Sequence, residues 1–138
     1  MTMPLSLVGF GLCAALTAPQ TSSSGPSLTS PAVTGVFSNL RYNEHGADIL
    51  GVEVLITYTR TGYVAVVQIA EGVPEVPVVV PVHIEGSQVV FSFPAGGATL
   101  QFQGSVGTAA LEGGFSNGAF ADSPRGLVIL RRGKSYWQ

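Results

Sequence analysis

The chain has 138 residues, of which 46% are apolar and 10% charged, and it contains 18 glycines and nine prolines. This composition is too hydrophobic for a disordered chain and too rich in glycine for a helical bundle, and the length is that of one domain. A net charge of −2 argues against a nucleic-acid-binding protein, and one cysteine excludes both an intramolecular disulfide framework and a cysteine-rich metal site.

No charged side chain precedes Arg41. The apolar run from Leu5 to Leu16 has the length of a signal-peptide core but is too short to cross a bilayer as a helix, which takes about 20 residues. We therefore predict an export signal over residues 1–18, a flexible Ser/Pro linker over 19–31 and a folded domain over 32–138. The mature protein is expected to be exported to the periplasm or outside the cell, in a bacterial envelope, without a stable membrane span. The segment before Leu5 has no basic residue, which leaves a frayed apolar tail or a misplaced start codon as the alternative.

From Val33 onward, apolar and polar residues alternate, and turn residues recur about every 8–12 positions. The pattern predicts eight strands, over residues 34–41, 49–60, 63–70, 76–84, 88–93, 98–106, 109–116 and 126–132. Short connections that contain glycine place consecutive strands side by side in antiparallel hairpins. The fold class expected is all-β, with a single eight-stranded up-and-down meander barrel.

The alternation also assigns the two faces of each strand. In strand 98–106, Leu100 and Phe102 face inward while Gln101 and Gln103 face outward, as in antiparallel sheets with one wet side. Eight strands enclose a space that side chains fill or that holds one small ligand. The residues expected to line the interior, and to contact a small apolar ligand there, are Val54, Ile56, Tyr58, Val67, Phe91, Leu100, Phe102, Leu111 and Phe115.

Strand 76–84 contains two prolines, Pro77 and Pro81, four residues apart. Their missing N–H groups face the same neighbouring strand, so we expect one side of this strand to be unpaired or bulged, leaving a gap in the barrel. The alternative is that only residues 82–84 form regular strand and that the preceding segment is extended coil.

Two stretches resemble the ends of a group of small exported bacterial proteins of unknown function. They are Leu40-Arg41-Tyr42-Asn43-Glu44 with the following Gly-Ala-Asp-Ile-Leu-Gly (46–51), and the closing segment Arg132-Gly133-Lys134-Ser135-Tyr136-Trp137. More distantly, the eight-strand meander is similar to lipocalin, fatty-acid-binding and avidin-type barrels, and that likeness implies a small apolar ligand. The lipocalin Gly-x-Trp is absent, because Phe37 stands in place of the tryptophan.

The densest polar cluster lies between the first two strands and comprises Asn43, Glu44, His45 and Asp48. Imidazole and carboxylate groups suit Zn²⁺ or Mn²⁺, but Asn, Gly and Asp are also what a hairpin turn needs, and a solvated loop is favoured. His83 faces outward near Glu85, and no nucleophile elbow, phosphate-binding loop or metalloprotease motif occurs. We therefore expect no catalytic residue, no metal and no cofactor.

Aromatic and basic residues near the strand ends have structural explanations. Ordinary packing is favoured over lining of the barrel mouth for Tyr42, Tyr58 and Tyr63. Capping of a barrel end, with an arginine over an aromatic ring, is expected for the basic cluster beside Tyr136 and Trp137, which comprises Arg131, Arg132 and Lys134.

The resulting expectation is an exported, non-enzymatic barrel that binds a small apolar molecule in its interior. The alternative is a structural or protein-interaction module that uses the proline-marked edge of strand 76–84 for β-augmentation. An enzyme built on Glu44, His45 and Asp48 is the third possibility. The sequence leaves the oligomeric state and the identity of any ligand open.

Overall fold

The computed structural model describes residues 31–120 and 126–138, so the predicted export signal and linker residues 19–30 lie outside the described residues. The described chain is all-β. Its strands are β1 (Gly35–Ser38), β2 (Arg41–Asn43), β3 (Asp48–Thr59), β4 (Gly62–Gly72), β5 (Val78–Glu85), β6 (Gln88–Ala95), β7 (Ala98–Val106), β8 (Ala110–Phe115) and β9 (Val128–Gly133).

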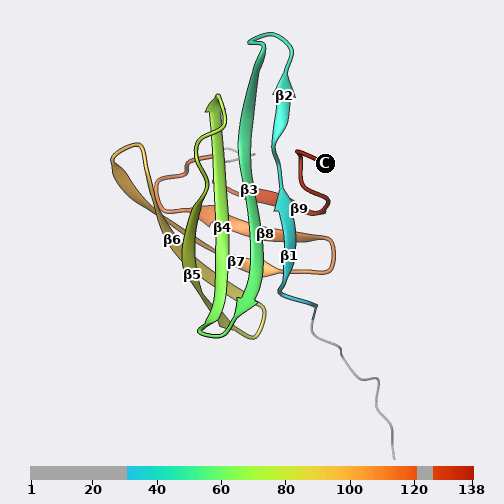
Figure 1. Ribbon diagram of the computed structural model, residues 1–138, viewed down its shortest axis with the longest axis vertical. Coiled ribbons are helices and arrows are strands. Elements are labelled where there is room, and N and C mark those ends of the chain that lie inside the picture. The colour runs from blue at the N-terminus through green and yellow to red at the C-terminus, as the bar shows by residue number, and fades with distance from the viewer. Residues whose placement is uncertain (1–30, 121–125) are drawn as a thin grey trace, which may run out of the picture.

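The strands form a closed eight-stranded antiparallel barrel with one extra strand. The order β1-β9-β8-β7-β6-β5-β4-β3 closes on itself because β1 pairs with both β9 and β3, while β2 extends the edge of β3. Each strand from β3 onward pairs with the next one along the chain, which confirms the predicted up-and-down meander. In Figure 1, the long strands β3 and β4 cross in front of β7, β8 and β9, so the barrel has two walls with differently directed strands.

The predicted strand 34–41 is divided into β1 and β2, which corrects the sequence-based boundary. Both strands pair with β3 in one register, and the break lies at Asn39. The Asn39 N–H donates to the Val52 carbonyl at 3.0 Å, and the Val52 N–H donates to Asn39 Oδ1 at 2.8 Å. The side-chain oxygen of Asn39 thus accepts the hydrogen bond that its backbone carbonyl would accept in a regular ladder. A Cβ at Gly51 would lie 2.7 Å from that carbonyl oxygen, so only glycine leaves room for the displaced peptide.

Strand β5 changes partner in its middle. Residues Val78 to Pro81 pair with β4, and residues Val82 to Glu85 pair with β6. Position 81 would be the next ladder position with β6, and proline has no N–H to donate there. The predicted unpaired side of the proline-containing strand is confirmed over residues 78–81, although the barrel as a whole is closed. The alternative, in which the regular strand begins only at residue 82, is wrong, because β5 begins at Val78.

The inward faces of the strands supply the core. Eight of the nine predicted interior residues are buried in it: Val54, Ile56, Val67, Phe91, Leu100, Phe102, Leu111 and Phe115. The exception is Tyr58, which is 64% exposed. It has the inward register, but it lies one pair from the end of β3, where its ring packs edge-on against Tyr63 with the centroids 4.9 Å apart. Tyr58 therefore belongs to the rim of the barrel and does not line its interior.

Candidate functional site

Phenylalanine rings fill much of the barrel interior. Phe91 stacks on Phe102 with the ring centroids 5.1 Å apart, and Phe102 meets Phe115 at 5.2 Å. Phe115 also contacts Phe93 at 5.8 Å and Phe120 at 5.5 Å. These are the separations of aromatic rings in contact. A ligand entering this part of the interior would have to displace rings that already pack on one another.

A pair of glycines holds the Phe102 ring against the barrel wall. Gly104 on β7 lies directly opposite Gly113 on β8. A Cβ at either position would lie within 2.8 Å of the Phe102 ring, and it would also collide with the backbone of the facing strand. The ring therefore occupies the space that two side chains would otherwise take.

Arg132 closes one end of the barrel. It lies opposite Phe37 in the β1–β9 ladder, and its guanidinium carbon is 4.5 Å from the centre of the Phe37 ring. The guanidinium donates to the carbonyls of Thr34 at 2.8 Å and Gly107 at 3.2 Å, and also to that of Ala32. Of the basic cluster expected to cap the barrel end, Arg132 alone lies over an aromatic ring, that of Phe37, whereas Arg131 and Lys134 are exposed. Arg132 also joins the start of β1 to the β7–β8 turn.

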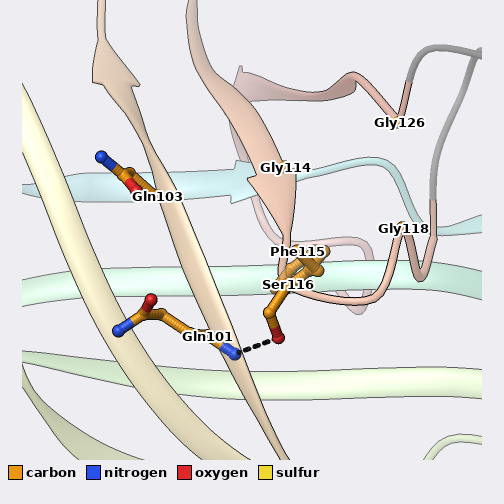
Figure 2. A pocket seen from close by; sticks show the side chains of 7 residues that line it. All are labelled: Gln101, Gln103, Gly114, Phe115, Ser116, Gly118 and Gly126. Atoms are coloured by element: carbon orange, nitrogen blue, oxygen red, sulfur yellow. Dashed lines mark hydrogen bonds between the residues drawn. The ribbon is translucent and has the colours of Figure 1, made fainter.

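Two hollows of about 460 Å³ each lie on the outside of the barrel wall. Figure 2 shows the first, over β7 and β8, where the Ser116 hydroxyl accepts a hydrogen bond from the Gln101 backbone N–H at 3.2 Å. The second lies where the pairing of β5 with β6 ends, between Pro81 and Ser92. Two predicted interior residues, Phe115 and Phe91, border these outer hollows.

The outer side of β1, β3, β4 and β5 is apolar where the alternation pattern would place polar residues. One row crosses all four strands in register, from Val36 to Leu55, Val66 and Val79. A second row runs from Thr57 on β3 to Val64 on β4 and Pro81 on β5. Leu55 is 39% exposed and Val79 66% exposed. We call this surface the outer apolar face; its apolar members are Val36, Leu55, Val64, Val66, Val79 and Pro81.

The C-terminal segment, residues 134–138, packs beside this face. The Ser135 hydroxyl donates to Glu53 Oε1 at 2.6 Å, and the Tyr136 N–H donates to Glu53 Oε2 at 2.8 Å. The Trp137 indole N–H donates to Gln68 Oε1 at 2.8 Å. Glu53 and Gln68 face each other across β3 and β4, so the segment covers the row of residues next to the outer apolar face. Covered in this way, Glu53 is buried although its register points outward.

The predicted polar cluster lies in the β2–β3 turn, where Asn43 is opposite Asp48 and both side chains lie beside Gly46. Glu44 and His45 are exposed, and Asp48 is half-buried at the start of β3. Within residues 31–120 and 126–138, no group of three or more His, Cys, Asp or Glu side chains is placed to hold a metal ion. His83 is exposed on the outer side of β5. The same ranges contain no helix with the length and hydropathy needed to cross a bilayer.

The outer apolar face was not predicted, although the sequence contains a signal for it. Residues 63–67 and 78–82 are uninterrupted apolar runs, whereas residues 98–103 alternate with Thr99, Gln101 and Gln103. A strand that is apolar on both sides is typical of a sheet covered on both faces. Alternation was therefore a good description of β7 and β8 but a poor one of β4 and β5.

Comparisons of the chain with known protein families, with curated proteins and with solved structures find no match.

Proposed function

We propose that this protein is an exported, non-enzymatic interaction domain, and that it pairs with a second copy of itself through the outer apolar face. The observation that carries the proposal is the row of Val36, Leu55, Val66 and Val79 on the side of the sheet turned away from the core. Positions of this kind are normally polar when one face of a sheet is in water. A contiguous exposed apolar patch is characteristic of a contact surface.

A second copy is the partner that the chemistry of this face favours. Its six apolar members carry no charge, and the carboxylate of Glu53, in the neighbouring row, accepts hydrogen bonds from the C-terminal segment. A two-fold dimer brings the same patch of both copies together, so an uncharged patch meets no like charge. The outer side of β7 and β8 is not an uncharged apolar surface, because Gln101, Gln103 and Glu112 are exposed there.

Contact through the face is favoured over addition of a strand at the local opening in the ladder beside β5, where residues 78–81 have no partner on β6. Prolines occupy both sides of this opening, with Pro77 and Pro81 before and within β5 and Pro94 on β6. Each lacks the N–H that an added strand would need as a donor. Prolines at sheet edges are a known protection against strand addition. A strand added by β-augmentation at this place would therefore find few backbone N–H donors.

The packed phenylalanine rings also favour the outer face over the barrel interior as the binding surface. Binding of a small apolar ligand inside the barrel stays a prediction from the sequence.

Export is proposed because the run from Leu5 to Leu16 has the length and hydropathy of a signal-peptide core.

Sedimentation equilibrium of the folded domain tests the pairing. We expect the unmodified protein to form a dimer and Val79→Glu to be monomeric at the same concentrations, because the substitution buries two carboxylates in an apolar contact. Val79 is 66% exposed, so the monomer itself should fold normally. The matched control is Gln103→Glu, which adds the same charge on β7 and should leave the dimer intact. A monomeric unmodified protein, or a dimer unaffected by Val79→Glu, contradicts the proposal.

A further inference from the structure

We propose that the notch between β2 and β9 binds a dianionic phosphate group through Arg41 and Arg131. None of these residues belongs to the outer apolar face, although Ser38 and Arg131 lie in the row next to Val36, and the proposal does not depend on dimer formation. The notch exists because β1 pairs with β9 only as far as Ser38 and Arg131, after which the chain turns away at Asn39. The hollow left between the two strands has a volume of about 320 Å³.

The notch holds two of the chain's six basic side chains. Arg131 lies on the outer side of β9 opposite Ser38, and Arg41 begins β2 three residues further along the chain. Neither guanidinium forms an ion pair or a hydrogen bond with another residue in the described part of the chain. By contrast, Arg132 uses its guanidinium on three backbone carbonyls. Two guanidinium groups that have no partner among residues 31–120 and 126–138 thus border one hollow, an arrangement that suits an anion.

Carboxylates lie near the notch but do not neutralise the arginines directly. Glu112 pairs with Ile129 and therefore lies diagonally across from Arg131 on the two neighbouring strands. Diagonal neighbours in a sheet are about 7–8 Å apart. Glu71 lines the adjoining hollow of about 170 Å³ together with Arg41. Glu53, opposite Ser38, has both oxygens engaged by the C-terminal segment.

The charge and shape of the notch select a phosphate monoester or inorganic phosphate. A phosphate group carries a charge of about −1.5 to −2 at pH 7. Two arginines balance that charge, whereas one arginine is enough to balance a carboxylate. The guanidinium fork is suited to two parallel hydrogen bonds to phosphate oxygens. Ser38 adds a donor, because its oxygen accepts the Leu40 N–H at 3.2 Å and its own hydroxyl hydrogen has no acceptor among the described residues. The hollow is at the lower end of ligand-pocket volumes, which are roughly 300–1,000 Å³.

Calorimetric titration with inorganic phosphate at constant ionic strength tests the site. We expect Arg41→Gln and Arg131→Gln each to weaken phosphate binding about tenfold, the loss typical of one charge-assisted hydrogen bond. The matched control is Arg60→Gln, which removes the same charge in the β3–β4 turn and should bind like the unmodified protein. Acetate should bind more weakly than phosphate. Equal phosphate affinity in all four proteins overturns the proposal, as does an equal loss in the three variants.

A second measurement uses the unmodified protein and does not depend on how the variants fold. Phosphate should shift the NMR signals of the Arg41 and Arg131 side-chain Nε–H groups and of the Ser38 amide, but not those of Arg60. Shifts confined to other residues contradict the assignment. Sedimentation with phosphatidic acid vesicles, compared with phosphatidylcholine vesicles, distinguishes the source of the group. Binding that Arg131→Gln abolishes identifies a lipid headgroup, whereas phosphate binding without vesicle binding identifies a soluble phosphate.

Discussion

The close approach of β7 and β8 is set by two facing glycines. A Cβ at Gly104 would lie 2.8 Å from the Gly113 Cα and 2.8 Å from Phe102 Cζ, and the first of these atoms is backbone that cannot turn away. We expect Gly104→Ala to lower the free energy of unfolding by about 2–3 kcal/mol, the cost of overpacking a tight core. Urea unfolding measures this change.

The control for this substitution is Gly133→Ala at the end of β9. No atom lies within 4 Å of a Cβ built there, so alanine should fit without strain. Its unfolding midpoint should equal or slightly exceed that of the unmodified protein, because alanine restricts the unfolded chain. If Gly104→Ala is as stable as Gly133→Ala, then Phe102 is not held by the glycine pair.

At the scale of elements, the C-terminal segment is attached to the barrel wall mainly by Glu53. Glu53→Gln leaves one acceptor oxygen where Ser135 and Tyr136 use two, and it removes charge-assisted hydrogen bonds worth about 1.5–3 kcal/mol each. We expect the segment to detach. Trp137 is the only tryptophan, so its fluorescence should shift to longer wavelength and its anisotropy should fall.

Glu112→Gln provides the comparison, since Glu112 is an exposed carboxylate on β8 and should leave Trp137 unchanged. Unaltered Trp137 anisotropy in Glu53→Gln would mean that the indole bond to Gln68 holds the segment without Glu53.

Elements were predictable where their formation depends on local chemistry. Glycine-containing hairpins and strict alternation located β6, β7 and β8 to within a few residues, and the prolines located the opening beside β5. The break at Asn39 was not predictable, because a side-chain oxygen takes over a backbone position there without any shift in register. The burial of Glu53 depends on a segment 82 residues away in sequence, and alternation carries no information about such contacts. The exposure of Tyr58 follows from its place at the barrel rim, which the period-two pattern does not mark.

The whole molecule combines a filled interior with an unusually apolar outer wall. The rings of Phe91, Phe102 and Phe115 pack the inside, and the row from Leu55 to Val79 places further apolar surface in water. A stable protein–protein contact generally buries about 1,200–2,000 Å² in total, so a dimer contact would extend beyond this row to its neighbours. The exposed Val76 and the indole of Trp137 are available to enlarge it.

Methyl NMR across a concentration series tests the central claim most directly, because it locates the contact in the unmodified protein. The methyl signals of Leu55, Val66 and Val79 should shift together as the concentration rises, while those of the buried Val54 and of Thr99 on β7 stay constant. Signals of Leu55, Val66 and Val79 that do not change with concentration, or changes confined to other strands, would contradict the proposed pairing.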